Sequence, residues 1–302
     1  MTPTPLPTEL AALFSDAESA ANRTLSVPLP PGRIIVAGDE ADARPVLWLS
    51  DGPAPRGLWA RLRADHAQSG LWPLLLGDNN IALRRNPNPR YRIPELFRPW
   101  ETGELYPHAM SSPEAHDPDA LPAGWWARHI APLESMGQSA DAAGWPAVVA
   151  PFGRSRPGPA AAKQPRTDPD WQAEQVADEL NVEYPWMRLG LIATDRSADA
   201  PCIVGWYGAV NKIGDSGQIS AVLRDWERRF ATRVAGADFG TLYLSVAAPP
   251  EDEREALSVA AEHFALCPDN VWQRLLPFGQ AAEISGYADE LVASPSRSFW
   301  WD

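Results

Sequence analysis

Several features that define common protein classes are scarce in this sequence of 302 residues. It has two cysteines, Cys202 and Cys267, which are too few for a disulfide framework. No apolar run approaches the roughly 18 residues that a membrane-spanning helix needs. Residues 1–10 lack the basic start and the apolar core of a signal peptide. We therefore expect a cytoplasmic protein that contacts no membrane.

The sequence also lacks the motifs by which common enzyme classes are recognised. It contains no phosphate-binding glycine loop, no dinucleotide-binding glycine pattern, no serine hydrolase elbow and no zinc-protease helix. Its histidines and acidic residues match no compact set of four metal ligands. We therefore expect neither a cofactor nor a metal, and we favour a protein that is not an enzyme.

Lysine is nearly absent, and negative charge is in excess. Arginine supplies all but Lys163 and Lys212 of the 26 basic residues, against 39 acidic residues, for a net charge of −13. Residues 161–302 hold 12 basic and 22 acidic side chains, a net charge of −10. Such a surface repels the phosphate backbone of nucleic acids and favours a partner protein that carries positive charge.

One segment departs from this acidity. Residues 84–100 combine five arginines with three aromatic side chains, a combination that can stack on bases or hold phosphates. The Asn-Pro repeat at residues 86–89 predicts a turning loop, whose side chains need not share a face. We expect a solvated or internally paired loop, and nucleic-acid binding is the lesser alternative.

Proline and glycine divide the chain into two parts. The sequence RSRPGPAAAKQ at residues 154–164 is small, rich in proline and without hydrophobic periodicity, which is typical of a linker. We therefore predict two domains. The first is a loop-rich α+β region over residues 1–160 that is rich in proline and tryptophan, and the second is an acidic α+β domain over residues 166–302.

Short elements are predicted for the first part. Strands are expected at residues 33–37 and 46–50, and a helix with an apolar stripe at residues 58–66. The apolar sequence of residues 71–77 predicts a buried strand, which Pro73 places at a sheet edge or delays until after the proline. A short helix at residues 125–130 and a strand at residues 147–151 complete this part.

The second part is predicted as a small mixed or antiparallel sheet with a hairpin, packed by three or four helices. Asp168 and Pro169 start a helix whose Trp171 is expected to face inward. An apolar stripe over residues 219–230 predicts a second helix, with Asp225 paired on its wet side to the arginines three and four residues later. Strands at residues 233–237 and 241–246 form the hairpin, and we expect one buried and one wetter face on the second strand.

His263 and Cys267 form the strongest catalytic candidate. They lie four residues apart, and Asp269 follows closely. A thiolate beside an imidazole is what a cysteine nucleophile requires. The alternative to a binding protein is therefore a small-molecule enzyme that uses Cys267 with His263 and Asp269. The competing interpretation is that Pro268 breaks the helix and leaves Cys267 as a packed junction residue.

Tryptophan, with 14 residues, outnumbers both phenylalanine and tyrosine. Two adjacent pairs occur, at residues 125–126 and 300–301, and neighbours on a strand point to opposite faces. We expect at least one member of each pair to be exposed, where it either ties down the chain or contacts a partner. The binding candidates are Trp272, Gln273, Trp300, Trp301 and Asp302.

The order of features in the second part resembles a known bacterial family. A Trp-bearing helix, a hairpin ending in TLYLSVAAPP, a helix leading into CPDNVWQ, and a terminal FWWD are similar to domain of unknown function 4253 over residues 189–302. The most specific parts are Cys267-Pro268-Asp269, Gln273 and Phe299-Trp300-Trp301-Asp302. GLWPLLLG at residues 70–77 and Arg98-Pro99-Trp100 resemble actinobacterial members. Arg274 departs from the family pattern, which has glycine there, and this puts the local turn in doubt.

The resemblance implies an α+β domain and brings no established activity, substrate or cofactor. Our leading hypothesis is a non-catalytic cytoplasmic protein that binds another protein, in an immunity-like or regulatory role. The absence of catalytic motifs, the local acidity and the surplus of tryptophan favour it.

Overall fold

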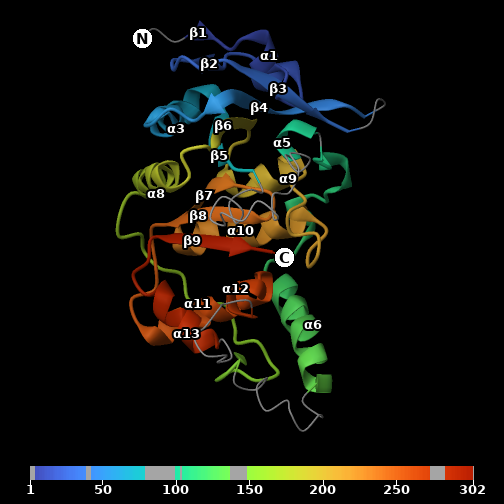
Figure 1. Ribbon diagram of the computed structural model, residues 1–302, viewed down its shortest axis with the longest axis vertical. Helices are drawn as coiled ribbons and strands as arrows, with labels where there is room; N and C mark the ends of the chain where they lie inside the picture. Colours follow the sequence, from blue (N-terminus) through green and yellow to red (C-terminus); the bar gives the residue numbers. More distant parts are fainter. Residues whose placement is uncertain are drawn as a thin grey trace, which may run out of the picture.

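The computed structural model describes residues 4–38, 42–78, 99–102, 104–136, 148–272 and 283–301. Within these residues, seven strands form one mixed sheet in the order β3-β4-β6-β5-β7-β8-β9 (Figure 1). The strands are β3 (Gly32–Ala37), β4 (Arg44–Pro53), β5 (Leu71–Leu76), β6 (Arg188–Ala193), β7 (Thr232–Ala237), β8 (Thr241–Val246) and β9 (Ser296–Trp300). Neighbours are antiparallel except for β5 and β7, which are parallel. The predicted α+β class is confirmed.

Strands from both sides of residues 154–164 alternate in this sheet. β6 belongs to the second part of the chain, yet it lies between β4 and β5, which belong to the first part. β5 pairs along its whole length with β6, and it pairs with β7 at its C-terminal end. Residues 1–160 and residues 166–302 therefore both contribute strands to one sheet, and the predicted boundary between them does not separate two sheets.

The prediction that Pro73 places β5 at an edge or delays its start is wrong, because β5 begins at Leu71 and lies inside the sheet. Pro73 lies opposite Leu191 of β6. Since the Thr194 amide donates to the Gly70 carbonyl, the even-numbered positions of β5 exchange hydrogen bonds with β6, and the Pro73 nitrogen points the other way. The β7 ladder begins only at Leu75, so the N–H group that proline lacks is not needed.

Helices cover both faces of the sheet (Figure 1). α3 (Leu58–Ser69) and α8 (Pro169–Glu183) pack on β5, β7 and β8, and α9 (Ala200–Val204) and α10 (Ser216–Phe230) pack on β4, β6 and β7. Every residue of β5 and β8 is consequently buried. The expectation of a wetter face on β8 is wrong, because Tyr243 and its neighbours on that face are covered as well.

A further group of helices lies beyond β9 (Figure 1). α11 (Glu253–Leu266) packs against α13 (Ile284–Leu291) and α6 (Ala120–Met136), and α12 (Asp269–Trp272) contacts β9. α6 is longer than the helix predicted for residues 125–130. Trp125 and Trp126 are both buried on it, which contradicts the expectation of one exposed ring. Residues 148–150 form a helical turn, and the strand predicted there is wrong.

The remaining described elements are short. Near the start of the chain, β1 pairs antiparallel with β2 in a separate two-stranded sheet. The elements are β1 (Thr4–Pro5), α1 (Thr8–Ala11), α2 (Ala17–Ala20), β2 (Thr24–Leu25) and α5 (Pro99–Thr102), with 3-10 turns η2 (Pro107–Ala109), η3 (Pro113–Ala115) and η4 (Ser197–Asp199). No helix in the described ranges has the length and apolar character needed to cross a membrane.

Local sequence signals account for several element ends. The Asp168 carboxylate accepts hydrogen bonds from the amides of residues 170 and 171, and so it caps α8 as predicted. The Asp238 carboxylate accepts from the amides of Gly240 and Thr241 at 3.0 and 2.7 Å and closes the predicted hairpin between β7 and β8. Trp171 does not face inward, because its side chain is 48% exposed on α8.

The segment expected to be a linker is fastened to the second part by a buried ion-pair network. The Ala160 amide donates to Glu262 at 2.7 Å, and the Ala160 carbonyl accepts from Arg229 at 2.7 Å. Arg229 also pairs with Glu262 and with Asp225. The predicted pairing of Asp225 with Arg228 and Arg229 is confirmed, but the Asp225–Arg229 pair is buried rather than on a wet side.

Arg297 on β9 is a second buried cation, and it holds the end of α13. Its guanidinium donates to the carbonyl oxygens of Leu291, Ser294 and Ser296. Burial lowers the pKa of Arg297 to about 10. Carbonyls at a helix C-terminus attract cations, so this contact fixes α13 against the last strand.

Candidate functional site

The residues of the nucleophile hypothesis take part in three separate sets of contacts. The Cys267 thiol is fully buried after α11 and donates to the Trp300 carbonyl at 3.0 Å. The His263 Nδ1 atom lies 3.0 Å from the Tyr287 hydroxyl, and the Asp269 carboxylate lies 3.5 Å from the Lys212 ammonium. These residues are close together in the sequence, but in the structure each of them contacts a different partner.

Electrostatics also work against a thiolate at this position. Burial raises the pKa of the Cys267 thiol, so the neutral form is favoured. Burial also lowers the pKa of His263 well below its usual range, and the nearby charges of Arg297 and Arg229 act in the same direction. The neutral His263 ring packs 4.8 Å from Phe299 and 5.0 Å from Trp226, measured between ring centroids. His263 and Cys267 thus have the surroundings of core residues.

The residues that carry the family resemblance hold the last strand in place. The Trp300 amide donates to the Asn270 side chain at 3.1 Å, and the Trp301 indole donates to the Leu266 carbonyl at 3.2 Å. Phe299 and Trp301 are buried, whereas Trp300 is 43% exposed. The expectation that one ring of this pair is exposed is confirmed. The main chain of Trp300 is fixed while its indole faces solvent.

The other predicted binding residues either are less exposed than Trp300 or lie outside the described residues. Trp272 is half-buried, and its ring packs against Phe264 at 5.4 Å and His129 at 5.7 Å between centroids. His129 is also buried, with its Nε2 atom 3.0 Å from the Ala265 carbonyl. Gln273 and Asp302 lie outside the described residues, as do Arg274 and the arginines of residues 84–98.

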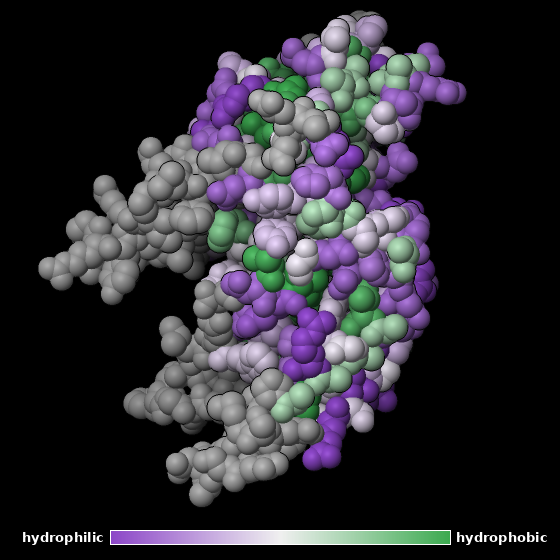
Figure 2. Space-filling view, turned by 90° about the vertical axis from the view of Figure 1, so that its right-hand side faces the viewer, coloured by the Kyte–Doolittle hydropathy of each residue, from purple (hydrophilic) through white to green (hydrophobic). Residues whose placement is uncertain are grey.

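Four exposed aromatic side chains lie on neighbouring segments, and we name them the aromatic patch. They are Tyr106 (39% exposed), Tyr207 (40%), Phe239 (39%) and Trp300 (43%). Figure 2 shows one face of the molecule, on which green apolar and purple polar side chains are interspersed.

Close backbone packing brings the parts of the aromatic patch together. The Tyr106 and Tyr207 rings lie 5.2 Å apart between centroids. A Cβ atom on Gly208 would lie 2.3 Å from the Phe239 carbonyl, so only glycine fits beside that turn. A Cβ atom on Gly240, the residue after Phe239, would lie 4.0 Å from the Trp300 ring. The hairpin turn thus lies between the residue 205–210 loop and the end of β9.

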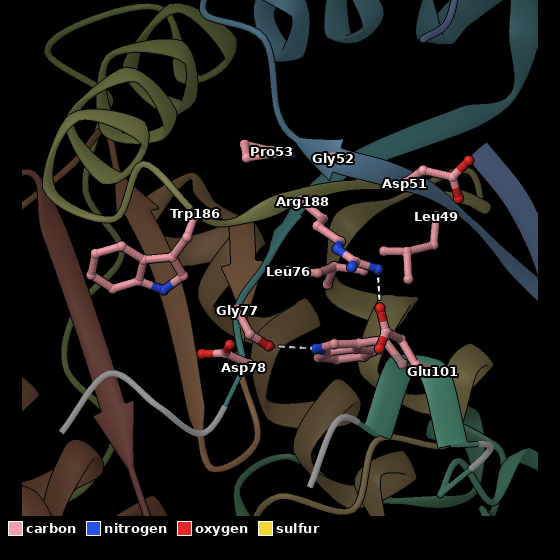
Figure 3. A pocket seen from close by; sticks show the side chains of 11 residues that line it. Leu49, Asp51, Gly52, Pro53, Leu76, Gly77, Asp78, Glu101, Trp186 and Arg188 are labelled. Carbon is pink, nitrogen blue, oxygen red and sulfur yellow. Dashed lines mark hydrogen bonds and ion pairs between the residues drawn. The ribbon is translucent and has the colours of Figure 1, made fainter. Parts of the chain in front are cut away.

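A separate cleft lies at the ends of the central strands, and we name it the strand-end cleft (Figure 3). β4 and β5 both end there, β6 begins there, and α5 closes one side. Its charged lining consists of Asp51, Asp78, Glu101 and Arg188, and its volume is about 180 Å³. Leu49, Leu76 and Trp186 contribute apolar surface.

A chain of ion pairs organises the strand-end cleft. Arg188 pairs with Glu101, and Glu101 lies 3.5 Å from Arg33, which in turn pairs with Asp51 at 2.9 Å. The Trp100 indole donates to the Gly77 carbonyl at 2.7 Å and ties α5 to the end of β5 (Figure 3). In this view, Trp186 and Asp78 lie on one side of the cleft, and Arg188 and Glu101 lie on the other.

Sequence reasoning did not find the strand-end cleft. Its residues come from four separated segments, and no motif connects them. The sequence held one signal for this cleft. Asp51 lies near the C-terminal end of an apolar strand and Asp78 follows another, and the C-terminal ends of these strands share one edge of the sheet. Such an edge is where α/β proteins commonly bind ligands.

The fold is α+β, with a mixed sheet and a buried thiol, and its described residues form the aromatic patch and the strand-end cleft. Within it, residues 188–302 match the family model described as Domain of unknown function (DUF4253). The match confirms the resemblance for this part of the chain, and the actinobacterial character of the first part stays a prediction. No curated protein and no solved structure gives a match to the chain. Of the charged residues that line the strand-end cleft, the matched region contains Arg188 alone.

Proposed function

We propose that this chain is a non-catalytic, cytoplasmic binding protein, with an immunity-like or regulatory role, that takes a basic protein partner on the aromatic patch. The exposure of four aromatic side chains on neighbouring segments carries the proposal. Aromatic residues are favoured anchors at protein interfaces because they bury a large area at a low cost in conformational entropy.

Charge determines which partner suits this surface. The net charge of −10 over residues 161–302 attracts a basic protein and repels an acidic one. Exposed indole and phenol rings also accept arginine and lysine side chains on their faces. The alternative, a small-molecule enzyme with Cys267 as nucleophile, gains no support from a buried thiol whose neutral form is favoured.

Affinity capture from a native lysate, with each bound protein purified and measured by calorimetry, tests the proposal. We expect a basic partner whose affinity falls at least tenfold for Tyr207→Ser and for Trp300→Ser, and weakens as the salt concentration rises. Trp171→Ser is the matched control, since Trp171 is 48% exposed on α8 and does not belong to the aromatic patch. A partner that binds the patch variants as tightly as the natural chain, or an acidic partner, contradicts the proposal.

A further inference from the structure

A small internal cavity is lined by residues of α10, α11 and strands β7 to β9, and we propose that it binds a monatomic anion, chloride. We name it the Arg297 cavity, after the one charged side chain on its wall. The inference does not depend on the aromatic patch. It rests on a buried cation without a carboxylate partner, on two N–H groups without a hydrogen-bond acceptor among the described residues, and on the size of the cavity.

The charge of Arg297 is only partly compensated. Its side chain is 6% exposed, and its two Nη atoms donate to the carbonyl oxygens of Leu291, Ser294 and Ser296 at 2.7 to 3.1 Å. These oxygens are neutral groups, and the end of a helix carries only a partial negative charge. No carboxylate of the described residues forms an ion pair with Arg297. Because buried charges are costly without a counter-ion, this part of the core favours an added negative charge.

Arg297 also has an unmatched donor. Its Nε atom is buried and has no hydrogen-bond partner. Buried donors of this kind are rare in folded proteins, because each one loses its hydrogen bond to water and gains nothing in return. An anion in the Arg297 cavity can accept from the guanidinium and compensate its charge at the same time.

His263 supplies a second donor on the same wall. The Asn270 side chain donates to the Tyr287 oxygen at 3.3 Å, so the Tyr287 hydroxyl has its own hydrogen available for the His263 Nδ1 atom, 3.0 Å away. A neutral imidazole that accepts at Nδ1 carries its proton on Nε2. Within the described ranges, no hydrogen bond engages His263 Nε2. The ring therefore offers an N–H group and no negative charge.

Size and lining select the occupant. The cavity has a volume of about 10 Å³, whereas one buried water needs roughly 10–15 Å³. A chloride ion is only slightly larger than water, whereas phosphate, sulfate and carboxylates are much too large. Apart from the Trp226 indole, which donates to Glu262, the Thr232 hydroxyl is the one further polar side-chain group of the lining. A water molecule needs acceptors for two hydrogens, and this wall offers chiefly donors. Chloride only accepts.

The test measures urea unfolding of the full chain as chloride replaces gluconate at constant ionic strength. Gluconate is far too large for the Arg297 cavity. A ligand that binds only the folded chain stabilises it in proportion to the logarithm of its concentration once the site is filled. Above saturation, we expect each tenfold rise in chloride to lower the unfolding constant about tenfold, which corresponds to one ion released per chain.

Variants then assign this dependence to the cavity, and the comparison among them removes general effects of salt on stability. Arg297→Met removes the cation. Val259→Ile enlarges a side chain of the cavity wall and removes no donor. In both variants, a tenfold rise in chloride should change the unfolding constant by less than about twofold. Arg254→Met is the matched control, because it removes an exposed arginine from α11 and should keep the full dependence.

The proposal is overturned if chloride changes the unfolding constant of the natural chain by less than about twofold over the whole range, which would leave water as the occupant. It is also overturned if Val259→Ile and Arg297→Met keep the full chloride dependence, since the ion would then bind elsewhere. Val259→Ile decides the matter if Arg297→Met does not fold.

Discussion

The reactivity of the Cys267 thiol is the property that most directly distinguishes the binding-protein hypothesis from the enzyme hypothesis. In a chain with Cys202→Ser, Cys267 is the sole thiol, and its exposed fraction is 0%. An alkylating reagent therefore reaches it only after the last strand separates from α11, which breaks the thiol–Trp300 hydrogen bond and uncovers Phe299 and Trp301. Reaction requires an opening of the structure.

The size of the expected effect follows from the cost of that opening. Core elements open with free energies that approach the global stability, commonly about 5 kcal/mol or more. At about 1.4 kcal/mol for each factor of ten, the open fraction is on the order of 1 in 10³ to 1 in 10⁴. The native thiol should therefore react at least about a thousandfold more slowly than the same thiol in denaturant.

The assay is the rate of reaction with a chromogenic disulfide reagent, measured from pH 6 to 10 in native buffer and in urea. The native rate should stay low and show no midpoint below the ordinary thiol value of about 8.5. Rapid native labelling with a midpoint clearly below that value would refute our reasoning and return Cys267 to the role of nucleophile.

Three further predictions concern stability, each measured by urea unfolding. Burial lowers the pKa of His129 to about 4, so on acidification the unfolded chain binds a proton at this residue before the folded chain does. The stability that this group contributes above pH 6.5 is therefore lost as the pH falls from 6.5 through 4, by up to about 3 kcal/mol. His129→Gln should make this loss of stability in acid shallower. Glu262→Gln should lower the free energy of unfolding by about 3 kcal/mol and speed proteolysis within residues 154–164, because it deprives the buried Arg229 of a charged partner. Unchanged resistance to protease would contradict the buried ion-pair network. Arg297→Met should lower the free energy of unfolding by about 3 kcal/mol, because it leaves carbonyls at the end of α13 unpaired. The control is Arg254→Met at an exposed position, which should change that free energy by less than about 0.5 kcal/mol. Equal effects of the two variants would contradict a stabilising role for the buried contacts of Arg297.

Local elements were predictable because local rules produce them. The β7–β8 hairpin and α10 were recognised from alternation, helical spacing and turn residues, and the Asp168 cap fixed the start of α8. Each of these depends on residues within a few positions of one another. The α+β class followed from the same patterns.

Predictions failed where distant contacts decide the outcome. Pro73 suggested an edge strand, but its effect depends on which side of β5 pairs at that residue. The small, proline-rich residues 154–164 suggested a linker, and the contacts that hold Ala160 to Arg229 and Glu262 on distant helices could not be read from that composition. The strand-end cleft combines residues 49–53, 76–78, 100–101 and 186–188, and no local pattern connects these segments.

The position of β6 has a consequence for synthesis of the chain. β4 and β5 leave the ribosome first, and the strand that fills the gap between them follows much later in the sequence. At typical rates of translation, two largely apolar strands wait on the order of ten seconds with unpaired edges. A nascent chain in this state is a natural substrate for chaperones. Synonymous codons that slow translation between residues 77 and 187 should therefore lower the yield of folded protein without changing a single amino acid.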